Sequence, residues 1–418
     1  MTWQLPPIWV LVLWIAWGAQ ALLTMLAVRK FNRLIRTQRG RYDDITRDRQ
    51  PHVAVIVPVK GVGEHFDAHV RSVLGQRYRS YRVIFAVESQ SDPAHAALEQ
   101  HVASPPVDPL VGLTAAEVVV AGRAEREGQK VHNQLAALRR LADEEQFVAF
   151  ADADAVVGPL WLQELAAPPN WGDIGATTGY RWLIPPAEAG ESLRAARRHL
   201  PSLLASVINA SGLTLMGSER SDCAWGGSMA IRRDILEQYD LAGRWRGSMN
   251  DDWQLTRLVR RVPGYRILFM TPCVVPTDVN YTWSSAWEFG TRQYRQTRLY
   301  SPKAWSFAAA VLTAYWAGWV AAIGGLAAGY ACAVAPILWV LIMERWRARQ
   351  RRRVIERLFD AALIERLRPV LTLERWATPL YMAVHLALVW STALGRRITW
   401  SGITYHIRDR QDVEIVDR

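Results

Sequence analysis

Cysteine is scarce in this sequence. Its 418 residues include three cysteines, Cys223, Cys273 and Cys332, which lie far apart along the chain. Their spacing fits no metal-ligand motif and no disulfide framework, which excludes a disulfide-rich scaffold and a cysteine-rich zinc domain. Internal repeats are also absent, so a solenoid is excluded. We therefore expect a reducing compartment for the middle of the chain.

Positive charge is missing before the first apolar run. Leu5 to Val28 is almost unbroken apolar sequence, long enough to cross the roughly 30 Å hydrocarbon core of a bilayer. A signal peptide carries Lys or Arg before its apolar run, whereas here the basic residues follow it. They are Arg29, Lys30, Arg33, Arg36, Arg39 and Arg41. We predict an uncleaved transmembrane anchor over residues 1–30, with its carboxyl end in the cytoplasm.

A second apolar stretch covers residues 304–343 and has Gly324-Gly325 at its middle. It is too long for one ordinary crossing, so we predict a transmembrane helical pair with the turn at these glycines. An arginine-rich run from Arg345 to Arg353 follows, in a chain with a formal net charge of +11. We interpret this run as a positive-inside flank that touches anionic lipid, and we expect no nucleic-acid partner.

The last part, residues 344–418, is predicted to be a basic, amphipathic interfacial region. Residues 353–374 mix apolar and charged side chains at helical spacing. Thr378 to Leu394 is a marginal membrane span followed by Arg396-Arg397. Positive flanks on both sides contradict a simple crossing. Two alternatives stay open: a further membrane segment, or a re-entrant or tilted surface helix.

The polar middle, residues 50–300, alternates β-branched runs with helical patterns. The strand-like runs are His52–Pro58, Tyr81–Val87, Glu117–Ala121 and Phe147–Phe150, and the helix-like segments are Phe66–Leu74 and Lys130–Leu141. This alternation predicts an α/β domain with a mostly parallel, Rossmann-like sheet and right-handed crossovers.

Two carboxylates, Asp152 and Asp154, follow the run that ends at Phe150. They are expected at the carboxyl edge of the sheet, where open α/β sheets bind ligands. Paired carboxylates suit a hard divalent cation, Mg²⁺ or Mn²⁺, and such a cation suits a nucleotide diphosphate. The structural alternative is a polar turn at the end of a strand.

The order of motifs in this middle part resembles the inverting glycosyltransferase family 2 with the GT-A fold, and most closely its ceramide glucosyltransferase-like branch. The matching segments are Val57-Pro58-Val59-Lys60-Gly61, Glu88 to Ala94, Lys130 with Asn133, Asp152 with Asp154, Gly226-Gly227-Ser228-Met229, Asp251-Asp252-Trp253 and Arg292 with Arg295. Two positions depart from the family pattern. Glu88 stands where the family often has Asp, and Gln296 stands where (Q/R)xxRW has Trp. The missing Trp lowers the expectation of a polysaccharide-extending synthase.

The resemblance implies catalytic roles for the Asp251-Asp252 pair. Asp252 is the candidate general base that accepts the proton of the acceptor hydroxyl, and Asp251 is the adjacent alternative. Helix capping is the structural alternative, because Asn250-Asp251-Asp252 is a good helix start. Both roles are compatible, since a base at a helix start is rigidly positioned.

The resemblance also implies a donor site. Asp154 is expected to bind the metal, and Asp152 the metal or the ribose. The residues expected near the nucleotide or the sugar are Pro58, Lys60, Glu88, Asp92, Lys130, Asn133, Gly227, Arg292 and Arg295. The arginines lie one helical turn apart, and two guanidinium groups can grip a diphosphate. The structural alternatives are turn formation for Asp92, a solvated helix face for Lys130 and a plain turn for Gly227.

These expectations combine into one enzyme: an integral membrane glycosyltransferase with its catalytic domain on the cytoplasmic side. It would move a hexose or N-acetylhexosamine from a UDP-sugar to the hydroxyl of a membrane lipid, with a divalent metal at the diphosphate. Two alternatives stay open, a processive polysaccharide synthase and a non-catalytic membrane protein with a nucleotide-sugar-binding domain.

Overall fold

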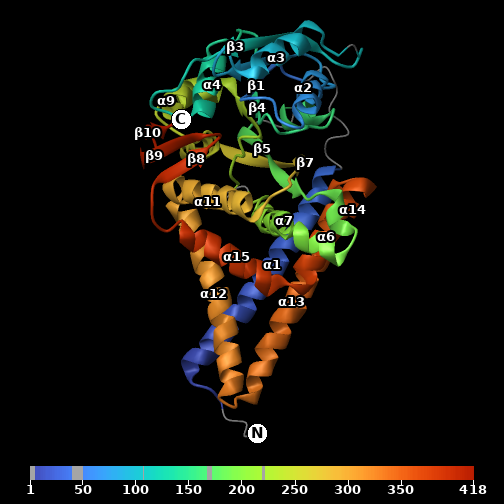
Figure 1. Ribbon diagram of the computed structural model, residues 1–418, viewed down its shortest axis with the longest axis vertical. Helices are drawn as coiled ribbons and strands as arrows, with labels where there is room; N and C mark the ends of the chain where they lie inside the picture. Colours follow the sequence, from blue (N-terminus) through green and yellow to red (C-terminus); the bar gives the residue numbers. More distant parts are fainter. Residues whose placement is uncertain (1–4, 40–49, 107, 167–171, 219–221) are drawn as a thin grey trace. The chain divides into compact units, whose positions relative to one another are not determined.

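The structure, a computed structural model, describes residues 5–39, 50–106, 108–166, 172–218 and 222–418. Arg41, part of the expected cytoplasmic flank, lies outside these residues. The chain forms two compact units (Figure 1). The helical unit comprises Met1–Arg36, Leu183–Leu215 and Asp278–Gly395, and the sheet unit comprises Thr37–Trp182, Met216–Thr277 and Arg396–Arg418. These boundaries differ from the expected ranges 1–30, 50–300, 304–343 and 344–418.

The sheet unit is built on a seven-stranded, mostly parallel sheet of order β3-β2-β1-β4-β6-β5-β7. Its strands are β1 (Val53–Pro58), β2 (Tyr81–Val87), β3 (Leu113–Val120), β4 (Phe147–Ala151), β5 (Ile174–Ile184), β6 (Ser228–Arg232) and β7 (Arg266–Asp278). β1 pairs in parallel with β2 and β4, and β2 with β3, whereas β6 is antiparallel to β4 and β5. The expected α/β fold is confirmed, including all four strands expected from the sequence.

Helices cover both faces of this sheet because its central strands are apolar on both sides. In β1, Val55 and Val57 pack with α2 (Phe66–Leu74) and α3 (Pro93–Ala103). Ala54 and Ile56 point to the other face and pack with α4 (Gln129–Leu138), α9 (Leu241–Trp245) and α10 (Asp252–Arg261). Side chains of a strand alternate between the two faces, so a fully buried run such as β1 needs a helical layer on each side.

A second, three-stranded antiparallel sheet ends the chain and belongs to the sheet unit. Its strands are β8 (Arg397–Trp400), β9 (Ile403–Asp409) and β10 (Asp412–Asp417), drawn in red in Figure 1. The sequence analysis placed this segment in the basic, amphipathic interfacial region and did not predict these strands. The strand signal is the short alternation in which Ile403, Tyr405 and Ile407 are buried.

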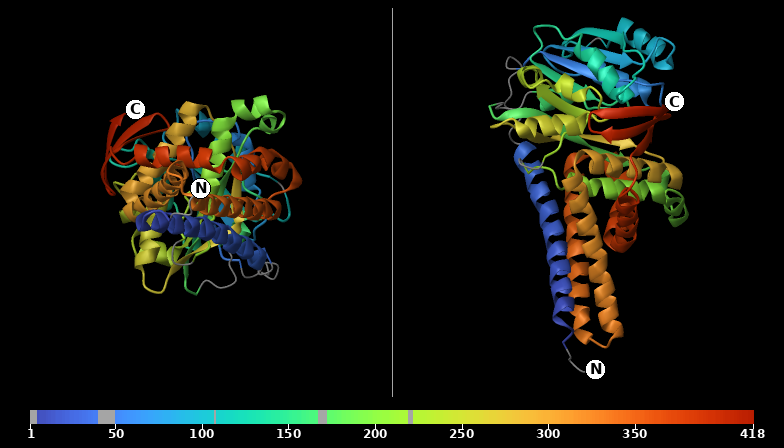
Figure 2. Two further views of the ribbon diagram at one scale, coloured as in Figure 1. Left: turned by 90° about the horizontal axis from the view of Figure 1, so that it is seen from below. Right: turned by 90° about the vertical axis from the view of Figure 1, so that its left-hand side faces the viewer.

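The helical unit contains three long helices that lie side by side, α1 (Ile8–Arg39), α12 (Pro302–Ala327) and α13 (Val334–Leu358) (Figure 2). They share a buried aromatic core that includes Trp14, Trp17 and Tyr315. The other helices of more than one turn are α6 (Leu193–Arg198), α7 (Leu200–Leu213), α11 (Trp283–Tyr300), α14 (Ala361–Trp376) and α15 (Thr378–Ser391). Among the described residues two segments, Ile8–Gln38 and Pro302–Ala327, are long and apolar enough to cross a membrane.

The turn between α12 and α13 lies later than Gly324-Gly325, where it was expected. Both glycines stay helical, and a Cβ on Gly325 would stand 2.8 Å from the Trp14 ring, so this glycine allows close helix packing. The chain leaves the helix at Ala328, and Gly329 adopts the left-handed φ of 89° that favours glycine.

Candidate active site

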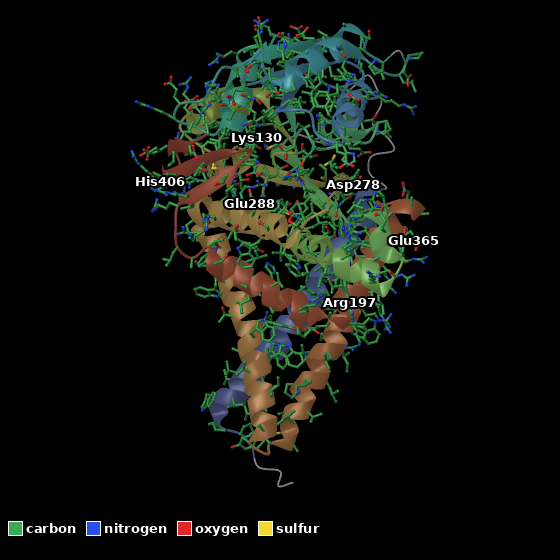
Figure 3. The ribbon with its side chains drawn as sticks, in the orientation of Figure 1. Lys130, Arg197, Asp278, Glu288, Glu365 and His406 are labelled. Carbon is green, nitrogen blue, oxygen red and sulfur yellow. The ribbon has the colours of Figure 1, made fainter. Side chains whose placement is uncertain are left out.

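Lys130 joins two carboxylates from different motifs. It lies in the first turn of α4 and is labelled in Figure 3. Its Nζ atom is 2.7 Å from Asp152 Oδ1 and 2.9 Å from Asp251 Oδ2. Asp152 follows the last residue of β4, and Asp251 precedes α10. The fold therefore brings three of the predicted site residues together at the carboxyl edge of the sheet.

The charges of this cluster are stabilised by one another. Burial alone would lower the pKa of Lys130, but the attraction of Asp152 and Asp251 raises it above its ordinary value. Burial would likewise raise the pKa of Asp152, but the positive charges of Lys130 and Arg181 hold it below its ordinary value. Lys130 and Asp152 are therefore both ionised at neutral pH, and the solvated helix face considered for Lys130 does not describe it.

Arg181 completes the cluster and was missed by the sequence analysis. Its Nη2 atom lies 3.1 Å from Asp152 Oδ2 and 2.9 Å from Asp154 Oδ1. Its guanidinium also lies over the ring of Trp225, 5.2 Å from the centroid. The available signal was an arginine inside the otherwise uncharged and mostly buried strand β5. A charge in such a strand needs a buried partner.

Neither carboxylate of the Asp251-Asp252 pair caps α10. The helix-capping role falls to Asn250, whose Oδ1 accepts a hydrogen bond from Trp253 N at 2.7 Å. Asp251 is bound by Lys130 and also accepts from Gln134 Nε2 at 2.9 Å. Asp252 accepts from the backbone N–H of Gly226 at 3.2 Å. Burial, together with repulsion from Asp251, raises the pKa of Asp252 to about 7.

Gly226 and Gly227 allow the backbone to pass close to these charges. A Cβ on Gly226 would stand 2.5 Å from Asp251 Oδ2 and 2.7 Å from Lys130 Nζ. A Cβ on Gly227 would stand 2.2 Å from the Trp225 ring and 2.7 Å from Asp152 Oδ2. The segment is therefore more than a plain turn, because any larger residue would displace the charged cluster.

Glu88 and Lys60 lie at the same edge of the sheet, after β2 and β1. Glu88 Oε1 is 3.4 Å from both Arg123 and Arg418. Lys60 Nζ donates to the backbone carbonyl of Ser401 at 2.9 Å. Both side chains therefore touch parts of the chain that the sequence analysis did not connect with them.

Three other predicted donor residues have structural contacts. Asp92 Oδ1 accepts from Ala94 N and Gly61 N, both at 2.9 Å, and so caps α3 as the turn-forming alternative proposed. Asn133 is buried and donates to Ala86 O at 3.0 Å. Pro58 ends β1, opposite Ala86 on β2. Their contact with a nucleotide stays a prediction.

Arg292 and Arg295 lie on α11 in the helical unit. The Arg292 guanidinium lies over the Phe289 ring, 5.7 Å from its centroid. Gln296, which stands where the family has Trp, is buried. The diphosphate role of these arginines stays a prediction.

Comparison with known families decides the class of enzyme. The model of glycosyl transferase family 21 matches residues 20–413. The chain belongs to glycosyl transferase family 21. This is the ceramide glucosyltransferase family, with a GT-A fold, and it confirms the branch that the sequence motifs resemble. The protein is therefore an enzyme that uses a nucleotide-sugar donor, and the non-catalytic alternative is set aside.

Solved structures with a similar fold include two kinds of transferase. A mannosyltransferase from Pyrobaculum calidifontis with GDP-Man and Mn²⁺ is 16% identical, covers 88% of this chain and 99% of its own, and has a TM-score of 0.47. Glucosyl-3-phosphoglycerate synthase from Mycobacterium tuberculosis with Mn²⁺, UDP-Glc and phosphoglyceric acid is 15% identical, covers 60% of this chain and 79% of its own, and has a TM-score of 0.34. No curated protein matches the chain in sequence.

The predicted metal ligands, Asp152 and Asp154, fit a divalent ion. In the described part of the chain no group of three or more His, Cys, Asp or Glu side chains is placed to hold a metal. Two carboxylates are enough for a hard cation when substrate phosphates and water supply the other ligands. The space between Asp152 and Asp154 already holds the Arg181 guanidinium, so it favours positive charge. Asp154 is the accessible one, with 57% of its side chain exposed.

Proposed function

We propose that this family 21 enzyme transfers a hexose or N-acetylhexosamine from a UDP-sugar to the hydroxyl of a membrane lipid, with inversion at the anomeric carbon. The observation that carries the proposal is Asp252. Its carboxylate takes no part in capping, has a pKa raised to about 7, and lies beside a cluster of ionised residues at the carboxyl edge of the sheet. A base whose pKa lies near the working pH is well suited to proton transfer.

The donor end of the reaction is assigned to the charged cluster. A UDP-sugar carries its negative charge on the diphosphate, and Lys130 and Arg181 supply two partly buried positive charges beside Asp152. Asp154, with Asp152, would hold a divalent ion, Mg²⁺ or Mn²⁺, which acts as a Lewis acid toward the leaving diphosphate. Gly226 and Gly227 leave room for the sugar against the backbone.

The acceptor end is assigned to Asp252. Its carboxylate takes the proton of the acceptor hydroxyl while the oxygen attacks the anomeric carbon and UDP leaves. Asp251 is bound by Lys130 and Gln134, so it positions the cluster and is the weaker candidate for the base.

A lipid acceptor is favoured by the helical unit. Its two long apolar helices, α1 and α12, are consistent with anchoring in a bilayer, and an anchored enzyme works where lipid hydroxyls are concentrated. Arg29, Lys30 and Arg33 follow the apolar part of α1. By the positive-inside rule we assign the sheet unit, which follows them in the chain, to the cytoplasmic side.

The test uses the full-length protein purified in detergent. It is incubated with a panel of UDP-sugars, Mg²⁺ or Mn²⁺ and total membrane lipid, and UDP release is measured together with lipid mass spectrometry. Asp252→Asn is the catalytic variant. Asp173→Asn is the matched control, because Asp173 is an exposed carboxylate paired with Arg266 on the surface of the same unit.

The expected result is lipid-dependent UDP release from one donor, with a glycolipid product, lost in Asp252→Asn and kept in Asp173→Asn. A long polysaccharide product would instead support the synthase alternative. Absence of UDP release with every donor, from folded protein, would contradict the UDP-sugar assignment.

A further inference from the structure

The turn between β8 and β9 reaches the predicted donor site. Trp400 ends β8, and its ring centroid lies 5.9 Å from Lys130 Nζ, within the range of a cation–π contact. The next residue, Ser401, accepts a hydrogen bond from Lys60 Nζ at 2.9 Å. Two of the residues predicted to meet the nucleotide therefore touch this one turn. They come from different parts of the chain, the loop after β1 and the first turn of α4.

The geometry of the turn is well defined. Trp400 pairs with Ile403, so Ser401 and Gly402 form a two-residue hairpin loop. Both have left-handed φ values, 50° and 80°, as a type I′ turn requires. The half-buried Trp400 side chain is thus carried on a short, constrained loop.

Hydrogen bonds also attach the three-stranded sheet to the rest of the sheet unit. The hydroxyl of Tyr405 on β9 accepts from Gln129 N at 3.2 Å. Gln254 on α10 donates to Arg410 O at 3.0 Å, and Gln411 donates to Gly243 O on α9 at 2.9 Å. These contacts fix the position of the turn relative to α4, α9 and α10. They argue against a mobile loop that moves away from the site.

We propose that the β8–β9 turn forms one wall of the donor site and that Trp400 contacts the nucleotide of the donor. The inference rests on the proposed function, because it takes Lys60, Lys130 and Glu88 as donor residues. Trp400 presents an aromatic surface next to the charged cluster, and Arg418, at the end of the same sheet, lies beside Glu88. An aromatic surface beside positive charges matches a nucleoside diphosphate, whose base stacks on rings and whose phosphates are anionic.

The test compares variants of the full-length enzyme in detergent. Trp400→Ala removes the ring, Trp400→Phe keeps an aromatic surface, and Thr399→Ala is the matched control, an exposed neighbour on the same strand. Measured are the KM for the donor, the KM for the acceptor, and the Kd of UDP by calorimetry in the presence of Mn²⁺.

Trp400→Ala is expected to raise the donor KM and the UDP Kd about tenfold or more, which is the usual range for a lost base–aromatic contact. The acceptor KM should change by less than about twofold. Trp400→Phe should recover most of the loss, and Thr399→Ala should behave as the wild type. An unchanged donor KM and UDP Kd in Trp400→Ala would overturn the proposal. A lower donor KM and UDP Kd in Trp400→Ala would also overturn it, since the Trp400 ring would then obstruct nucleotide binding.

A second pair of variants covers the case in which Trp400→Ala does not fold. Thr399→Ala, the exposed neighbour on β8, is again the control and should leave the UDP Kd unchanged. Gly402→Val forces a β-branched residue into a left-handed φ and should weaken UDP binding, although no atom lies within 4 Å of the added Cβ. Equal UDP affinity in both variants would contradict the proposal. The binding measurement remains informative if no acceptor is found, so failure of this inference is distinguishable from failure of the proposed transfer.

Discussion

Replacing Asp252 by Asn is expected to remove activity and, at the same time, to stabilise the folded protein above neutral pH. The pKa of this carboxyl is raised from 3.8 to about 7, chiefly by burial and then by repulsion from Asp251. A group whose pKa is raised on folding stabilises the protein while it is neutral, at low pH. That contribution is lost as the pH rises through the pKa of the folded state.

The magnitude follows from the difference of about three pH units between the two pKa values. At about 1.4 kcal/mol per unit, ionised Asp252 costs the folded state at most roughly 4 kcal/mol at pH 8. Asn cannot ionise, so the variant should gain roughly 1–4 kcal/mol at pH 8. The gain should be smaller at pH 5, where the folded wild type already holds this carboxyl protonated. Loss of the general base should lower kcat about 10²–10⁴-fold.

The assay pairs UDP release with thermal unfolding in detergent, at pH 5 and pH 8, for the wild type, Asp252→Asn and Asp173→Asn. Wild-type kcat should fall about tenfold per pH unit below pH 7, because the base must be ionised to act. The reasoning is refuted if Asp252→Asn keeps more than about a tenth of the activity. An increase in Tm that is the same at both pH values would refute it equally.

Three further changes test other parts of the structure. Asp154→Asn should raise the Mn²⁺ concentration for half-maximal UDP release about tenfold or more; an unchanged metal titration would exclude this residue as a ligand. Gly227→Ala should destabilise the protein by about 1–3 kcal/mol, because its Cβ would clash with the Trp225 ring and the Asp152 carboxylate. Gly63→Ala, whose Cβ has no atom within 4 Å, should leave the Tm in thermal unfolding nearly unchanged. Glu374→Gln should lower the free energy of unfolding by about 3–5 kcal/mol, because it leaves two buried arginines without their carboxylate. Glu365→Gln, at an exposed ion pair, should lower it by less than about 1 kcal/mol. Equal losses of stability in thermal unfolding would contradict the argument.

Much of the fold was predictable because its signals are local. Short β-branched runs such as His52–Pro58 alternate with amphipathic segments, and this periodicity indicates a parallel sheet with crossover helices. The pair Asp152 and Asp154 after an apolar run indicates a ligand site at the carboxyl edge. Together with Gly226-Gly227 and Asp251-Asp252 in a fixed order, these residues were enough to indicate the enzyme family.

The partners within the site were decided only by the tertiary structure. β4 lies next to β6, and their register places Ala151 opposite Ser228, which brings Gly227 beside Asp152. Arg181 reaches the same carboxylate from β5, and Trp400 reaches Lys130 from the far end of the chain. Periodicity reports which face of an element is apolar, but not which distant element packs there. The tertiary structure therefore decided that Lys130 pairs with Asp152 and Asp251, which leaves Asp252 as the proposed base.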